Sequence, residues 1–122
     1  MIIIKKIKWI DKEAQEAEVL LSDNNYCILC FSSPCTLSEN SIFEDIIYGF
    51  NVENIFKLSQ EEYAVEKDDK SYSHKLKGKF VDDRNSILQI GEFRIDLSDG
   101  EIPKDTIAGD FIEVSVSRID IY

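Results

Sequence analysis

The sequence predicts an all-β protein built from two consecutive β-meanders, with at most one short helix. Apolar and polar residues alternate in several short runs, as they do on half-buried strands. Turn-forming residues separate these runs. The chain has 122 residues, of which 43% are hydrophobic, and this is enough to bury the core of one ordinary domain.

In the first half, Ala17, Val19 and Leu21 form the apolar face of a strand whose other face is polar. Turn residues 22–25 follow, so the chain returns along residues 26–31 as the second strand of a hairpin. Residues 26–31 are apolar at nearly every position, which predicts a central strand covered on both sides.

Residues 51–58 allow two interpretations. Val52, Ile55 and Phe56 have the spacing of a short helix with Asn51 as its N-cap. The run also fits a continuing strand, and comparison with the second half favours the strand.

The second half follows the same pattern. Residues 74–81 alternate, residues 82–85 form a turn and residues 86–90 make a short strand. Gly91 marks a tight reversal or a bulge, and residues 92–97 alternate again. These segments make a three-stranded meander.

A long last strand is predicted over residues 110–122. Its apolar positions alternate up to Val116 and resume at Ile119, an odd-numbered step later. Such a phase change indicates a bulge or bend near Ser117 and Arg118.

The two halves resemble distant copies of each other. Residues 8–11 (KWID) match residues 79–82 (KFVD), and residues 41–46 match residues 106–111. The alternative is that the two halves are unrelated, because any two meanders show the same alternation of apolar and polar residues. The predicted division is a first half at residues 1–58, a charged connector at 59–73 and a second half at 74–122, or a single domain over 1–122.

The second half combines its meander with an irregular stretch at residues 99–108 and a closing strand that begins at Gly109. This combination is similar to the small barrels of the oligonucleotide/oligosaccharide-binding (OB) type. The resemblance implies one or two small OB-like barrels whose second and third strands carry the ligand. Those strands would be residues 86–90 and 92–97, and they offer Arg94 without an exposed aromatic pair, which speaks against nucleic-acid binding.

The charge balance favours a basic partner. The formal net charge is −10, from 24 acidic and 14 basic side chains, so the averaged field repels nucleic acid and anionic membranes. The alternative is that the acidity serves only solubility. We expect a cytoplasmic protein without membrane association, because no apolar run is long enough to cross a bilayer and the first ten residues do not form a signal peptide.

Three cysteines and the single histidine are the candidates for metal or catalytic chemistry. Cys27, Cys30 and Cys35 could bind zinc with His74 or a carboxylate as the fourth ligand. However, Cys27 and Cys30 would point to opposite faces of a strand, so buried reduced thiols are the favoured interpretation. His74 is expected at the exposed start of a strand, without a catalytic motif around it. We therefore expect no enzyme activity, no catalytic residue and no cofactor.

One predicted strand carries a stripe of lysines, although the net charge of the chain is negative. Lys75, Lys77 and Lys79 would lie on one face of a strand and, with Arg94, could bind the phosphates of a nucleic acid. The favoured interpretation is an edge strand protected from aggregation by lysine, because no aromatic residues lie between the lysines.

Together these observations favour a non-enzymatic binding protein, with an OB-like nucleic-acid-binding protein as the alternative. In size and charge the chain is similar to bacterial immunity proteins that neutralise toxins. This resemblance implies an acidic inhibitor of a basic protein partner, such as a toxin. The expected interface consists of strand carboxylates with one aromatic anchor: Glu16, Glu18, Glu92, Asp96 and Tyr48. Tyr48 could instead pack in the core.

Overall fold

The computed structural model describes residues 1–122 as twelve β-strands without a helix. The first six are β1 (Ile2–Asp11), β2 (Glu16–Ser22), β3 (Cys27–Ser32), β4 (Ile42–Phe43), β5 (Ile47–Phe50) and β6 (Glu53–Lys57). The other six are β7 (Ala64–Lys67), β8 (His74–Asp82), β9 (Ile87–Ile90), β10 (Phe93–Asp96), β11 (Phe111–Val116) and β12 (Arg118–Ile121). The predicted all-β class and both meanders, β1-β2-β3 and β8-β9-β10, are confirmed.

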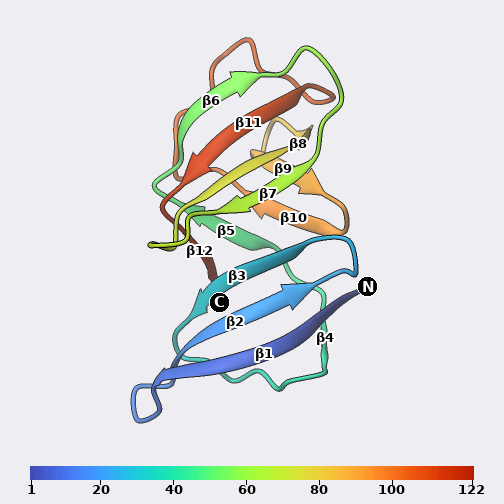
Figure 1. Cartoon of the computed structure of the whole chain (residues 1–122). Coiled ribbons are helices and arrows are strands. Elements are labelled where there is room, and N and C mark those ends of the chain that lie inside the picture. Colours follow the sequence, from blue (N-terminus) through green and yellow to red (C-terminus); the bar gives the residue numbers. More distant parts are fainter.

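All twelve strands belong to one mixed sheet. Its order is β4-β1-β2-β3-β12-β5-β10-β9-β8-β11-β6, and β7 pairs with the first part of β8. In Figure 1, β1 to β4 lie in the lower part of the molecule, whereas β6, β8 and β11 lie in the upper part. The pairing follows an open path that ends at β4 and β6, so it does not close the second half into a five-stranded barrel of its own.

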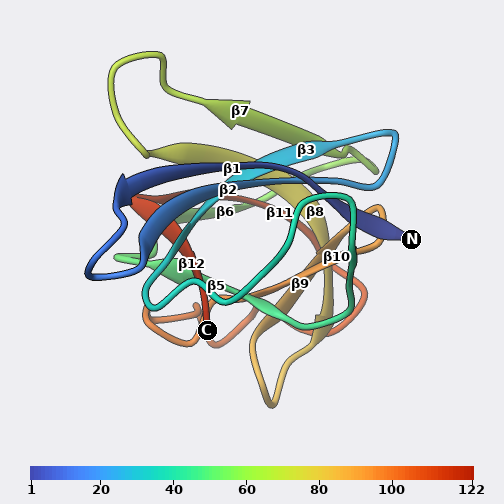
Figure 2. The ribbon, with the colours of Figure 1, turned by 90° about the horizontal axis from the view of Figure 1, so that it is seen from below.

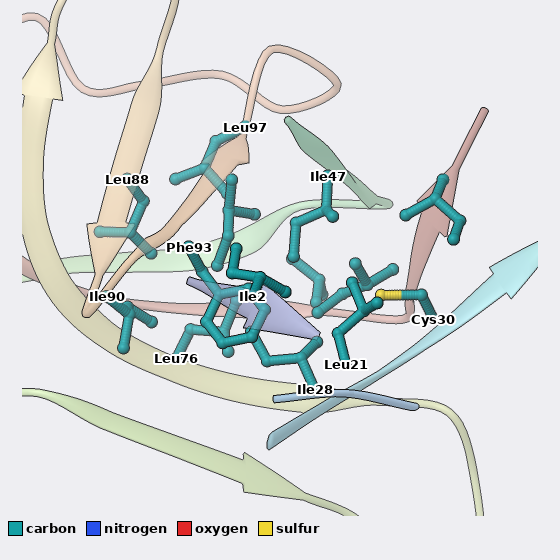
Figure 3. Close-up of a cluster of buried hydrophobic side chains, with 14 of the residues drawn as sticks. Ile2, Leu21, Ile28, Cys30, Ile47, Leu76, Leu88, Ile90, Phe93 and Leu97 are labelled. Atoms are coloured by element: carbon teal, nitrogen blue, oxygen red, sulfur yellow. The ribbon is translucent and has the colours of Figure 1, made fainter. Parts of the chain in front are cut away.

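The sheet curls around one apolar core. Figure 2 shows the strands of both halves arranged around a common interior. A cluster of 23 buried residues packs there, and Figure 3 shows Leu21 and Ile28 of the first half beside Phe93 and Leu76 of the second. Full burial of one such side chain contributes about 1.5–3 kcal/mol. Both halves therefore depend on the same core.

The two halves exchange one strand each. β12, the last strand, pairs in parallel with β3 of the first meander. β5, which follows the first meander in sequence, pairs in parallel with β10 of the second. β5 and β12 then pair with each other in antiparallel fashion at the centre of the sheet. The order β1-β2-β3-β12 thus corresponds to β8-β9-β10-β5, which gives the sheet an approximate twofold axis.

Matching turns follow β1 and β8. Asp11 and Asp82 each end their strand, and the Oδ1 of each accepts hydrogen bonds from the backbone N–H groups two and three residues further on. The turns end at Gln15 and Ser86, each with φ of 57°. The local geometry therefore agrees with the predicted correspondence of KWID and KFVD.

The predicted match of residues 41–46 with residues 106–111 is wrong. β4 pairs with the start of β1, whereas the start of β8 pairs with Ser115 and Val116 at the end of β11. The two residues of β4 therefore correspond to Ser115 and Val116. The similarity was misleading because a turn precedes each of these strands, at residues 38–41 before β4 and at residues 107–110 before β11, although the two strands occupy different places in the sheet.

Two predictions about strand boundaries are confirmed. Ser117 separates β11 from β12, which is the bend expected in the last strand. Residues 51–58 contain β6 and no helix, as the comparison of the halves favoured. The predicted connector, residues 59–73, contains β7, whose four residues were not predicted as a strand.

The prediction that β3 is covered on both sides is wrong. Ile28 and Cys30 are buried, but Cys27 is exposed and Leu29 and Phe31 are only half-buried. Only the inner face of β3 meets the common core. Its outer face is partly covered, since Arg118 lies against the Phe31 ring.

Asp23 ties the turn after β2 to the turn after β9. Its Oδ1 accepts hydrogen bonds from the N–H groups of Asn25 and Tyr26, and its Oδ2 accepts one from the N–H of Glu92 at 2.9 Å. Burial acts to raise the pKa of Asp23, but these three hydrogen bonds outweigh it and lower the pKa. Gly91 leaves room for the carboxylate, since a Cβ there would lie 2.3 Å from Oδ2.

Candidate functional site

A row of acidic and aromatic side chains crosses the outer face of the sheet where the two halves meet. Strand register places its members side by side on β2, β3, β12, β5 and β10: Glu18, Phe31, Asp120, Tyr48 and Asp96. Directly paired residues on neighbouring strands point to the same face, with Cβ atoms about 4.5–5.5 Å apart. We call these five residues the acidic aromatic row.

The alternation along β5 shows that the row faces outward. Ile47 and Gly49 are buried, whereas Tyr48 and Phe50 are 37% and 49% exposed. A strand turns successive side chains to opposite faces, so the inner residues pack in the core and the outer ones meet solvent. Tyr48 is therefore a surface residue, and the alternative of core packing is wrong.

Arg118 stabilises the centre of the row. Its Nε donates to Asp120 Oδ1 at 2.6 Å, and a terminal nitrogen donates to Oδ2 at 3.0 Å. Its guanidinium carbon lies 4.7 Å from the centroid of the Phe31 ring and 5.2 Å from that of Phe50. The hydrogen bond to Asp120 raises the pKa of Arg118. The charge of Asp120 is thus compensated. Glu18 accepts a hydrogen bond from the Tyr72 hydroxyl and lies opposite Lys8 on β1, so Asp96 is the carboxylate of the row without a paired cation.

A hollow of about 270 Å³ opens at one end of the row. Tyr48 and Asp96 line it, together with Phe50, Asp99, Asp120 and Tyr122. The rings of Tyr48 and Tyr122 meet edge to face, with centroids 5.2 Å apart. No lysine or arginine lines the hollow, so it presents carboxylates beside aromatic rings.

The structure brings together three of the five residues predicted for the interface. Glu18, Tyr48 and Asp96 belong to the row, and Glu16 lies two residues before Glu18 on the same face of β2. Glu92 does not join them. It lies in the β9–β10 turn, where its carboxylate pairs with the amino group of Met1.

Four residues of this face were not predicted as site residues: Phe31, Phe50, Arg118 and Asp120. Their proximity depends on β12 lying between β3 and β5. A signal was nevertheless present in the sequence. Arg118 and Asp120 alternate with apolar Ile119 and Ile121, which places both charged side chains on one face of a strand.

The lysine stripe is not an edge strand, and that interpretation is wrong. β8 pairs with β11 along one side and with β7 and β9 along the other. The Lys77 ammonium lies 3.0 Å from Glu62 Oε1 and 3.8 Å from Glu113 Oε1, and Lys75 is paired across strands with Glu66. Acidic neighbours thus compensate much of the stripe's charge.

Lys79 is the exception, because aromatic rings flank it. Tyr26, Tyr63 and Gln89 line a hollow of about 410 Å³ with Lys79. Arg94 lies one strand beyond Gln89 in the same cross-strand row. No aromatic residue lies between the lysines in sequence, but other segments bring two aromatic rings to this lysine.

The cysteines and the histidine lie in different parts of the molecule. Cys27 is exposed, whereas Cys30 and Cys35 are buried, and none of the three is in a disulfide. Burial raises the pKa of the Cys30 thiol well above its ordinary value, and the charge of Asp120 adds to this effect. The structure contains no group of three or more His, Cys, Asp or Glu side chains that could hold a metal ion.

The prediction that His74 is exposed is wrong. It is 3% exposed, and its Nδ1 donates to the carbonyl of Tyr72 at 2.9 Å, since a carbonyl can only accept. Its ring borders a polar hollow of about 390 Å³ that Glu53, Glu66 and Lys67 also line. Burial lowers the pKa of His74, the hydrogen bond to Tyr72 opposes this, and the charge of Lys67 lowers it further.

Comparisons with protein-family models, with curated proteins and with solved structures each find no match to this chain. No helix of the structure is long and apolar enough to span a membrane.

Proposed function

We propose that this chain is a non-enzymatic, cytoplasmic binding protein, an acidic inhibitor of the immunity type, whose acidic aromatic row binds a basic protein partner. The observation that carries the proposal is the row itself. It presents Glu18 and Asp96 beside Phe31 and Tyr48 on the outer face of the sheet, where Tyr48 is exposed and the other three are half-buried. Aromatic residues dominate binding energy at protein interfaces, and complementary charge selects and steers the partner.

The charge of the whole molecule supports the same partner. A net charge of −10 attracts a basic protein from solution and accelerates its encounter with the row. The ionic strength of the medium should therefore control the association rate, because exposed charges are screened over about 8–10 Å at physiological salt.

Capture of the partner from a lysate of the source organism tests the proposal. We expect the immobilised full chain to retain a basic protein that binds again, with one-to-one stoichiometry, after purification. The double charge reversal Glu18→Lys/Asp96→Lys should abolish this capture, because it places two cations against a basic surface.

The matched control reverses two exposed acidic residues away from the row. Glu61→Lys/Asp69→Lys changes the net charge by the same amount, and both residues lie in loops beside β7. The control should still capture the partner. Equal loss of capture in both variants would show that net charge acts without the row, and a captured partner with an acidic surface would contradict the proposal.

A second candidate function, binding of single-stranded nucleic acid, is favoured by one observation: Tyr26 and Tyr63 flank Lys79. Bases stack on aromatic rings while lysine neutralises phosphate. Titration with single-stranded oligonucleotides at low and physiological salt separates the two functions. Salt-dependent binding that Lys79→Gln removes would support the second candidate over the first.

A further inference from the structure

The hollow at the end of the row has the chemistry of a receptor for one cationic side chain. The rings of Tyr48 and Tyr122 form one part of it, and the carboxylates of Asp96 and Asp99 form another. The negative face of an aromatic ring attracts a cation within about 6 Å of its centroid. Carboxylates beside such a ring add charge-assisted hydrogen bonds.

Both carboxylates keep an oxygen for a ligand. Asp96 Oδ1 accepts a hydrogen bond from the N–H of Ser98 at 2.8 Å, and its Oδ2 has no partner in the chain. Asp99 Oδ2 accepts one from the N–H of Asn51 at 2.6 Å, and its Oδ1 has no partner. The backbone hydrogen bonds orient both groups, and each carboxylate retains one oxygen without a partner in the chain.

Arg118 provides an intramolecular precedent on the same face. Its guanidinium makes two hydrogen bonds to Asp120 while it lies against the rings of Phe31 and Phe50. The neighbouring hollow offers the same combination of groups, carboxylate and aromatic ring, but no cation of the chain lines it. The planar guanidinium matches this combination better than a lysine ammonium, because it can stack and donate several hydrogen bonds at once.

We propose that this hollow binds the guanidinium group of an arginine side chain that projects from the basic partner. The inference rests on the proposed function and assigns the arginine's place at the interface. The guanidinium would lie against Tyr48 or Tyr122 and donate to Asp96 and Asp99.

Titration of the isotope-labelled full chain with a short peptide, acetyl-Gly-Arg-Gly-amide, tests the assignment by NMR. We expect amide shifts that saturate at Tyr48, Gly49, Ser98 and Asp99, and weaker binding of the lysine peptide acetyl-Gly-Lys-Gly-amide. Asp96→Asn/Asp99→Asn should weaken binding of the arginine peptide about fivefold, and Tyr48→Leu about two- to fivefold.

The control variant Glu61→Gln/Asp69→Asn removes the same number of charges from exposed loops and should bind like the wild type. The single variants Asp96→Asn and Asp99→Asn give the same test if the double variant does not fold. Shifts elsewhere on the surface, equal binding of the lysine peptide, or equal weakening in the control would each overturn the assignment.

The two proposals can fail separately. If the arginine peptide does not bind in the hollow, but Glu18→Lys/Asp96→Lys still abolishes capture of a basic partner, the partner-binding face stands and the arginine site is wrong. If the peptide binds in the hollow but no basic partner is captured, the proposed function is wrong and the site recognises arginine in another context.

Discussion

At the scale of single residues, the strand face on which a side chain lies decides whether it is buried or meets solvent. Glu18, Tyr48 and Asp96 could be predicted as surface residues because they alternate with apolar neighbours. Their proximity to one another could not be predicted. It depends on pairings between segments that lie far apart in sequence, which no local pattern encodes.

The three thiols should differ in reactivity. Cys27 is exposed, whereas Cys30 is buried with a raised pKa and Cys35 is buried. Because the thiolate is the reactive form, we expect iodoacetamide to modify one cysteine of the folded chain and all three after denaturation. Peptide mapping by mass spectrometry should place the first modification at Cys27. Rapid modification of Cys30 in the folded chain would contradict the burial described above.

His74 should make the stability depend on pH in the mildly acidic range. Its pKa is lowered in the folded chain by burial, so protonation favours the unfolded chain. The stability contribution of the neutral ring is fully present above its ordinary pKa of 6.5 and declines as the pH falls below that value. Glu66 and Lys67 of β7 border the same hollow.

Urea denaturation between pH 5 and pH 7.5 measures this effect. The wild type should lose stability as the pH falls, whereas His74→Gln, which cannot titrate there, should have a nearly constant free energy of unfolding. The carboxylates with lowered pKa values lose their contribution only below their ordinary pKa of 3.8, so they do not interfere. Identical pH profiles for the two proteins would contradict the role of His74.

At the scale of elements, the meanders could be predicted but the short strands could not. β4 has two residues and β7 has four, too few for a period of two to be recognised. β12 was predicted only as the end of a longer strand, and its separate place in the sheet depends on the turn at Ser117.

The contact between the turns after β2 and β9 should contribute measurably to stability. Asp23→Asn replaces a carboxylate oxygen that accepts from Glu92 N–H, and the amide cannot satisfy all three donors. We expect the free energy of unfolding to fall by about 1–3 kcal/mol. Asp69→Asn, at an exposed position without such bonds, should change it by less than about 0.5 kcal/mol. Equal effects of the two substitutions would contradict this contact.

At the scale of the whole molecule, strand exchange makes the halves depend on each other. Residues 1–58 lack β12, which lies between β3 and β5, and residues 74–122 lack β5, which lies between β10 and β12. We expect the full chain to unfold in one cooperative transition and neither half to fold alone. Denaturant titration and the dispersion of amide NMR signals test this, and a folded isolated half would contradict it.

The approximate twofold symmetry also shows how similar positions acquired different chemistry. Lys8, Glu18 and Phe31 form one cross-strand row, and Lys79, Gln89 and Arg94 form the corresponding row of the second half. The lysine is common to both rows, whereas the acidic and aromatic residues of the first row are replaced by an amide and a basic residue in the second. The matching turns were predictable from KWID and KFVD, but this division of surface chemistry depends on the strand register.

The association rate of the captured partner, measured as a function of ionic strength, tests the central claim most directly. For the wild type and for Glu61→Lys/Asp69→Lys, the rate should fall as salt rises from 50 to 300 mM, because attraction between the acidic face and a basic partner is screened. For Glu18→Lys/Asp96→Lys, association should be lost or more than about tenfold slower at low salt. A rate that is independent of salt, or equal in the two variants, would contradict a partner-binding role for the acidic aromatic row.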